Sequence, residues 1–373
     1  MGVNLANGSI VSFPIGHPPG SLTEEGVCGL ADANQPTAMA VPGMVKITVS
    51  KAGKTLWTLD AVRPASSSGT RGSGVELRLV NYKGKRVLYR GHVPILTVRY
   101  DNDACGPYRD WQNEEGAIVA PDGTDIGTTG FRLCNSPAKT MLDTGSDQGD
   151  HLGPAIYIDG EDVVIVSEME AGWYRYISEW RLHSDGTIQP RFGFSAVSNS
   201  CVCHAHHHHA YWRLDFDIET AGNNLVEEFD RKLWIPPQPS GTWTPLEYET
   251  KRVRFPIFAR KWRVRNATTN AAYEIIPGAT DGAADSAFGV GDFWAVRYRS
   301  DEIDDGVNIT RDPNLDAASN ASKLLAHIDN FVTGESIENT DVVVWYAAHF
   351  THDFHENEVG HIVGPILKPS NWS

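Results

Sequence analysis

Five histidines stand within six residues near the middle of the chain, in the run H-A-H-H-H-H at positions 204–209. The residues after it, 211–218, read Y-W-R-L-D-F-D-I and alternate apolar and polar side chains over much of their length, which indicates a strand. On an extended backbone, side chains two positions apart lie on one face, so histidines of this run can reach one metal ion in pairs. The pairs are His204 with His206, His206 with His208, and His207 with His209.

Imidazole nitrogen suits copper, zinc, iron or nickel, and two histidines leave a third ligand to come from elsewhere in the chain. The alternative is a solvated histidine-rich loop, because such tracts are only compositional hints. An expression tag does not fit, since tags lie at termini and this run lies inside a strand pattern. Cys201 and Cys203 flank the run and are either soft copper ligands or two small buried residues.

Composition narrows the class of protein. The chain has 373 residues, 41% of them hydrophobic, which is enough for a sizeable core. Its formal charge is -15, from 47 acidic and 32 basic residues without a basic block, so we expect neither nucleic acid nor membrane as a partner. No apolar run reaches membrane-spanning length, and the first residues lack a signal-peptide pattern. Several N-x-S/T sequons are compatible with a secreted or extracytoplasmic protein. The five cysteines leave at least one outside any disulfide within the chain.

The pattern along the chain predicts an all-β fold. Residues 1–40 are rich in Gly, Pro and small polar residues and read as an irregular segment. From position 41 to 373, short strand-like runs alternate with turn signals, and the hairpin around Ser184-Asp185-Gly186 is the clearest. One helix is expected, Ala317 to Asn330. Many short strands with little helix predict a large antiparallel β-sandwich or barrel.

Three blocks of the sequence resemble the copper amine oxidases, in the large C-terminal catalytic β-sandwich domain of that family. The first is A-G-W-Y-R-Y-I-S-E-W at 171–180, followed by D-G-T-I; it is similar to the block around the tyrosine that becomes topaquinone. The second is the histidine-rich strand. The third is S-I-E-N-T-D-V-V-V-W-Y at 336–346, followed by T-H-D-F and later I-L-K-P. The resemblance covers residues 41–373 and implies that fold for them.

The resemblance implies two metal sites. Copper would be held by His206, His208 and His352. A second cation, which hard oxygen ligands suit to calcium, would be held by Asp215, the Phe216 carbonyl, Asp217 and Asp341. The odd offset along the strand independently puts Asp215 and Asp217 on the face opposite the two histidines, barring a bulge. One strand would therefore serve two ions, one on each face.

The resemblance also implies an activity, the oxidation of a primary amine by O2 to an aldehyde, ammonia and hydrogen peroxide. Tyr174 would be the precursor of topaquinone, and an aspartate would be the base. Asp110 is the first candidate base and Asp143 the second. An alternative alignment of the same stretch deletes the base segment and pairs Cys105 with Cys134 as a disulfide.

The motif departs from the family at Trp173, where the family has Asn, and at Arg175, where it has Asp or Glu. A copper enzyme on the same fold without topaquinone, oxidising or cyclising a small molecule with O2, is therefore the second hypothesis. A non-catalytic metal-binding relative is the third. The family is homodimeric, so the resemblance implies a dimer. The family pattern has no counterpart for five further histidines: His204, His207, His209, His349 and His355.

Overall fold

The computed structural model describes residues 2–4, 9–11, 28–30, 38–39, 41–67, 74–110, 114–115, 120, 122–147, 153–231, 241–284, 290–307, 314–316, 319, 322–323, 325–352 and 360–372. Within these residues the chain is almost entirely β-structure, which confirms the predicted fold class. The strands are β1 (Gly2–Asn4), β2 (Ser9–Val11), β3 (Ala38–Met39), β4 (Gly43–Lys51), β5 (Lys54–Arg63), β6 (Glu76–Tyr82), β7 (Lys85–Tyr100), β8 (Tyr108–Arg109), β9 (Glu114–Glu115), β10 (Thr124–Asp125), β11 (Arg132–Leu133), β12 (Ala155–Asp159), β13 (Asp162–Ala171), β14 (Tyr174–His183), β15 (Ile188–Ala196), β16 (His206–Phe216), β17 (Asn224–Arg231), β18 (Gly241–Leu246), β19 (Thr250–Arg252), β20 (Lys261–Asn266), β21 (Ala272–Ile276), β22 (Phe293–Arg297), β23 (Val342–His352), β24 (His361–Val363) and β25 (Ile366–Ser370).

The described helical segments are short. They are α1 (Met141–Thr144) and the 3-10 turns η1 (Asp101–Asp103), η2 (Ser200–Cys203), η3 (Pro256–Phe258) and η4 (Ile328–Phe331). Of the helix expected at 317–330, residues 317–318, 320–321 and 324 lie outside the described residues. Residues 319 and 322–323 are helical, and 328–330 belong to the 3-10 turn η4, so the described part is not one continuous α-helix. Among the described helices, none has the length and apolar character needed to cross a membrane.

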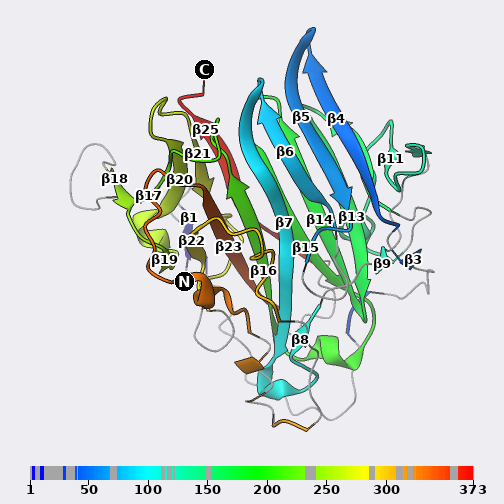
Figure 1. Ribbon diagram of the computed structural model, residues 1–373. Helices are drawn as coiled ribbons and strands as arrows, with labels where there is room; N and C mark the ends of the chain where they lie inside the picture. The colour runs from blue at the N-terminus through cyan, green and yellow to red at the C-terminus, as the bar shows by residue number, and fades with distance from the viewer. Residues whose placement is uncertain are drawn as a thin grey trace.

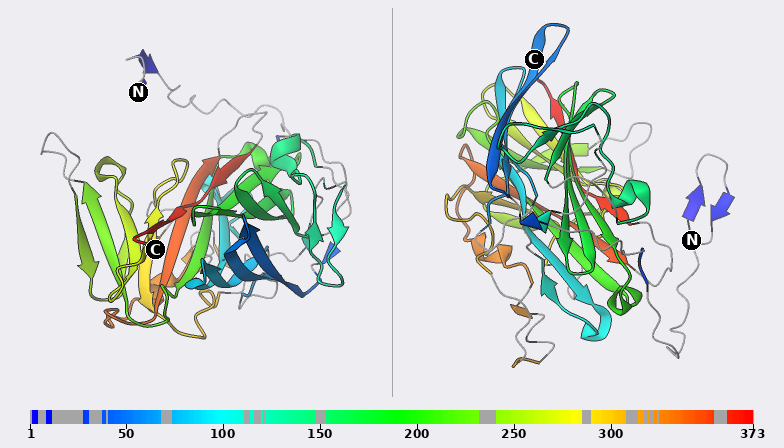
Figure 2. Two further views of the ribbon diagram at one scale, coloured as in Figure 1. Left: turned by 90° about the horizontal axis from the view of Figure 1, so that it is seen from above. Right: turned by 90° about the vertical axis from the view of Figure 1, so that its right-hand side faces the viewer.

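Two large sheets form a sandwich (Figures 1 and 2). Within the described residues, one sheet links 14 strands, in the main order β10-β11-β12-β13-β14-β15-β25-β21-β20-β17-β18. The other links nine, in the main order β19-β22-β23-β16-β7-β6-β5-β4. We call them the 14-strand sheet and the nine-strand sheet. Most pairings are antiparallel, and β16 lies between β23 and β7 in the nine-strand sheet.

Local sequence explains the hairpins. The β6–β7 turn has two residues, Lys83 and Gly84, both with positive φ (49° and 78°), which matches the right-handed twist of the paired strands. Strand β7 runs without a break over 16 residues, Lys85–Tyr100. Strands β17 and β18, which follow the histidine-rich strand, were not predicted from the sequence.

The main core lies between the sheets. Alternate residues of each strand point inward, so apolar side chains of both sheets meet there. An example of such a contact is the stacking of Trp262 from the 14-strand sheet on Phe293 from the nine-strand sheet, with ring centres 4.2 Å apart. On β16 the inward side chains include Ala210, Trp212 and Leu214. The histidines at even positions of the same strand share that inward face.

Candidate metal centre

Four strands end at one edge of the sandwich and bring their terminal side chains together. His206 begins β16, His352 ends β23 and Tyr100 ends β7, and His206 lies directly opposite both of the others in the sheet. Tyr174 begins β14 in the facing sheet. This edge is the lower end of the sandwich in Figure 1, near β8. Side chains far apart in the sequence therefore meet in the space between the sheets.

The three predicted histidine ligands lie together. His206 Nδ1 lies 2.6 Å from the carbonyl oxygen of His204, so Nδ1 carries the proton and donates it. The proton-free Nε2 lies 2.9 Å from Nδ1 of His352, a separation at which two imidazoles share a proton or an ion. The ring of His208 is centred 5.0 Å from that of His206. Among the described residues, no three histidine nitrogens lie within 4.8 Å of one another, so the side chains must turn for all three to reach one ion.

Two of the histidine side chains are neutral, which allows them to bind a metal ion. His206 and His208 are buried, with 0% and 1% of their surface exposed. Burial lowers the pKa of His206 to about 3, and burial followed by the neighbouring His206 lowers the pKa of His208 well below its usual value. Both imidazoles are therefore neutral near pH 7, which is the form that binds a metal.

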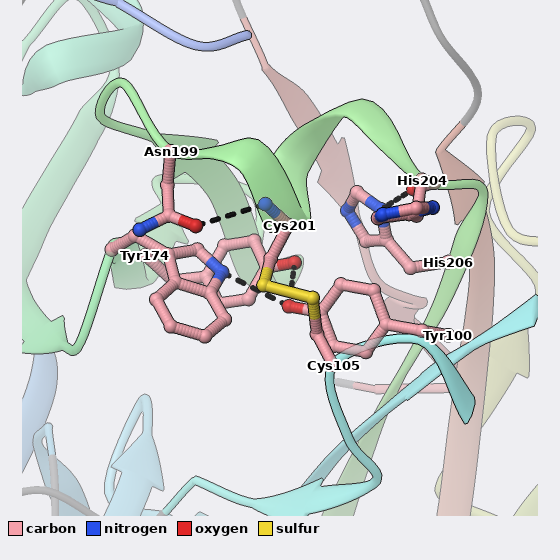
Figure 3. The surroundings of a disulfide bond; sticks show 8 residues. Tyr100, Cys105, Tyr174, Asn199, Cys201, His204 and His206 are labelled. Carbon is pink, nitrogen blue, oxygen red and sulfur yellow. Dashed lines mark hydrogen bonds between the residues drawn. A yellow bond between two sulfur atoms is a disulfide. The ribbon is translucent and has the colours of Figure 1, made fainter. Parts of the chain in front are cut away.

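Tyr174 lies beside these histidines. Its ring is centred 4.7 Å from that of His208 and 5.6 Å from that of His206. Its hydroxyl is 2.6 Å from the hydroxyl of Tyr100, which accepts a 2.9 Å hydrogen bond from the indole Nε1–H of Trp173 (Figure 3). The indole of Trp173 thus holds Tyr100, and Tyr100 in turn holds Tyr174. Burial raises the pKa of Tyr174 far above its usual value, so this phenol is neutral.

The two candidate bases have different surroundings. Asp110 accepts a hydrogen bond from the hydroxyl of Tyr176, whose ring is stacked on Tyr174 at 5.5 Å between centres. Burial raises the pKa of Asp110 to about 7, against the opposing effect of the Tyr176 bond. Asp143 instead accepts bonds from the backbone N–H and the hydroxyl of Thr140, forming a capping box at α1. The surroundings therefore favour Asp110 as a proton acceptor near Tyr174.

A small cavity adjoins the histidines. Its volume is about 20 Å³, which is room for one water molecule. Tyr174, His208, His352 and His361 line it together with aromatic side chains, notably Phe194 and Phe350. Three residues of this site, His361, Tyr100 and Tyr176, were not predicted from the sequence. Tyr100 and His361 reach the site through strand pairing, which no local motif marks, whereas Tyr176 follows Tyr174 by two positions and shares its face of β14.

Two disulfides correct the expectations for the cysteines. Cys201 bonds to Cys105 and Cys203 bonds to Cys28, so neither Cys201 nor Cys203 is a copper ligand, and the Cys105–Cys134 pairing is wrong. Cys134 is buried and takes part in neither disulfide. The short turn η2 directs its two cysteines to different partners, and the Cys105–Cys201 bond lies next to Tyr100 and His206 (Figure 3). Both disulfides thus anchor the turn that precedes the histidine strand.

Most of the additional histidines serve other contacts. His207 contacts Asp101 and Thr351 on the face of β16 turned away from Tyr174. On that same face, His209 and His349 are buried against each other with Nδ1 atoms 2.8 Å apart. The carbonyl of His204 orients His206, and His355 lies outside the described residues.

A second cluster lies toward the other end of β16. Among the described residues, Asp215, Asp217 and Asp341 form the group of three potential ligands whose oxygens all lie within 4.8 Å of one another. Asp215 and Arg213 face away from Trp212, Leu214 and Phe216 of the main core, as the offset predicts, although the pairing with β7 shifts register twice along this strand. Phe216 lies between Asp215 and Asp217 and pairs with Val342, next to Asp341.

The acidic cluster is electrostatically strained without a cation. Burial raises the pKa of Asp215 to about 6, with Arg213 opposing. Burial and then the charges of Asp215 and Asp217 raise the pKa of Asp341 to about 7. One buried carboxylate oxygen of Asp341, Oδ1, has no hydrogen-bond partner. Converging carboxylates with an unsatisfied oxygen fit a hard cation such as calcium.

Comparison with known proteins shows the fold. The chain matches no protein-family model and no curated protein. Its structure is similar to the copper-containing benzylamine oxidase of Hansenula polymorpha, with a TM-score of 0.54 at 14% identity over 87% of this chain and 60% of that one. It is also similar to the lysyl oxidase of Pichia pastoris, with a TM-score of 0.57 at 13% identity over 84% of this chain and 51% of that one. The amine oxidase of Aspergillus nidulans is similar with a TM-score of 0.52 at 16% identity, over 85% of this chain and 50% of that one.

These solved structures share the fold of this chain at low sequence identity. The chain spans less than two thirds of the length of each. The β-sandwich that the sequence predicts is thus confirmed, while the ligands, the base and the cofactor stay predictions.

Proposed function

We propose that this chain is a copper-dependent oxidoreductase that oxidises a primary amine. A copper ion on His206, His208 and His352, with topaquinone formed from Tyr174, would supply the redox chemistry that turns amine, O2 and water into aldehyde, ammonia and hydrogen peroxide. The position of Tyr174 carries the proposal, because its ring lies 4.7 Å from that of His208 at the edge where all three histidines meet. Fold alone does not define a reaction, so the site residues must.

The residues of the chain have separate roles in this proposal. Nδ1–H of His206 is engaged by the His204 carbonyl, which leaves Nε2 for the metal. Tyr100 holds the Tyr174 oxygen at 2.6 Å and keeps the ring in place. Asp110, with a pKa raised to about 7, is suited to take a proton from the α-carbon of the substrate at neutral pH.

The second candidate is a copper enzyme without topaquinone. Two observations favour it. Trp173 stands where the family has asparagine and donates its indole N–H to Tyr100, and the Tyr100 hydroxyl in turn hydrogen-bonds Tyr174, which is a buried neutral phenol. In this candidate the cavity of about 20 Å³ admits a molecule of the size of O2 or water, and Tyr174 stays unmodified.

A visible spectrum of copper-loaded, aerobically incubated protein separates the two candidates. We expect a broad quinone band that phenylhydrazine converts to an intense adduct, and neither signal in the Tyr174→Phe variant. One copper per chain without a quinone band would refute the first candidate and support the second. Failure of the protein to bind one copper ion per chain would refute both candidates.

Three further features complete the proposal. We propose calcium at Asp215, the Phe216 carbonyl, Asp217 and Asp341, supported by the converging carboxylates. A secreted or extracytoplasmic location is supported by the two disulfides, which persist in oxidising compartments. A homodimer follows from the resemblance, and sedimentation velocity tests it.

A further inference from the structure

The cavity beside Tyr174 has imidazole walls that come from both sheets. His208 on β16 and His352 on β23 belong to the nine-strand sheet, whereas His361 on β24 belongs to the 14-strand sheet. The cavity holds one water-sized species, about 20 Å³. An ion near this position would therefore meet a histidine that is not among the three proposed ligands.

His361 is held in place by its neighbours. It pairs with Phe194 of β15 in the sheet, and its ring is centred 4.0 Å from that of Phe350. The preceding Gly360 has φ of +112°, and a side chain there would lie 2.3 Å from the carbonyl oxygen of Phe194. Only glycine allows β24 to approach β15 so closely, so this residue fixes where His361 enters the space between the sheets.

Three of the ring separations among the four histidines lie in the range expected for imidazoles on one ion, and the rings must turn for their nitrogens to converge on it. With a metal–nitrogen distance of about 2.1 Å, each ring centre lies about 3.2 Å from the ion, so two ligand rings are roughly 4.5 to 6.4 Å apart, depending on the angle. The observed separations are 4.5 Å for His206 and His352, 5.0 Å for His206 and His208, and 6.3 Å for His352 and His361. All three values lie within the range calculated for two imidazoles on one ion.

We infer that His361 is a fourth imidazole ligand of this centre, so that the bound ion joins the two sheets. This inference rests on the proposed copper site at His206, His208 and His352. Four nitrogen donors favour the tetragonal geometry of copper(II). The fourth imidazole takes a position that water would otherwise hold, and it makes the centre a cross-link between β23 and β24.

Copper(II) binding to His361 variants tests the inference. We would load the wild-type chain, His361→Gln and His361→Phe with copper(II) alone, and count the coupled imidazole nitrogens by pulsed electron paramagnetic resonance. We expect four imidazoles in the wild type and three in both variants, with copper affinity at least about tenfold weaker by chelator competition. The matched control is His183→Gln, a histidine on the β14–β15 hairpin that pairs with Asp185; it should retain four imidazoles and full affinity.

The outcomes separate this inference from the proposed function. Three imidazoles in the wild type, with unchanged affinity in both variants, would overturn the fourth ligand and leave the copper site intact. Failure of the wild type to bind one copper per chain would overturn the copper site and the fourth ligand together. His361→Phe keeps an aromatic ring against Phe350, so the thermal melting of the metal-free variant shows whether packing alone has changed.

Discussion

Asp341→Asn should stabilise the protein without calcium and destabilise it with calcium. Without a cation, burial and the charges of Asp215 and Asp217 oppose ionisation of Asp341, which raises its pKa from 3.8 to about 7. A raised carboxyl pKa means that stability is lost as pH rises through that value, so the penalty is complete at pH 8. Full burial would make it about 4 kcal/mol, at 1.36 kcal/mol per tenfold change in ionisation. Because Asp341 is only about half-buried, screening reduces the penalty to about 1–2 kcal/mol.

Calcium reverses the order of the two proteins. A ligand at 100 times its Kd adds about 2.7 kcal/mol to the native state that binds it, and the asparagine variant lacks one charged ligand for that gain. For a 373-residue chain, about 0.8 kcal/mol corresponds to 1 °C in Tm, so the variant should melt about 1–3 °C higher in chelator at pH 8 and lower in millimolar calcium.

Differential scanning calorimetry in chelator and in calcium measures both arms. Asp60→Asn is the matched control, because Asp60 is a half-buried carboxylate on β5 of the same sheet that belongs to no such cluster. The control should show the same difference in both buffers. An Asp341→Asn variant that is less stable than the wild type in chelator, or a wild type that calcium does not stabilise, would refute the reasoning.

Three further predictions concern the site. With an amine substrate, kcat/KM should rise as pH increases through about 7, because Asp110 must lose its proton to act as the base. Asp110→Asn should lower the rate at least about 100-fold with copper content unchanged. A wild-type activity that is flat from pH 6 to 8 would contradict the assignment of Asp110 as the base. Replacing both Cys105 and Cys201 with serine opens a link that spans 96 residues, so denaturation should show a loss on the order of 4–5 kcal/mol by the chain-entropy account; a loss under about 1 kcal/mol would show that the turn η2 holds without it. Trp173→Phe removes the N–H donor to Tyr100 and should cost about 1 kcal/mol in urea unfolding, whereas Tyr108→Phe, in the same aromatic group, leaves that bond intact and serves as the control.

Periodicity in the sequence was enough to predict the all-β class, many of the strands and the shared face of His206 and His208. A strand repeats every two residues, so the type of each residue shows which side chains lie together along one strand. The same rule separates Asp215 and Asp217 from the two histidines. Asp341 was added as the third carboxylate by the family resemblance and not by periodicity, and the structure brings the oxygens of the three carboxylates within 4.8 Å of one another.

Contacts between strands distant in the sequence were decided only by the tertiary structure. Tyr100 and His361 reach the site through pairings of β7 and β24, which no local pattern specifies. The partners of Cys201 and Cys203 depend likewise on where the turn η2 lies relative to segments that are 96 and 175 residues away. Local sequence determines the direction of a side chain, because backbone geometry acts over a few residues. What that side chain meets is determined by packing of the two sheets, which depends on the whole chain at once.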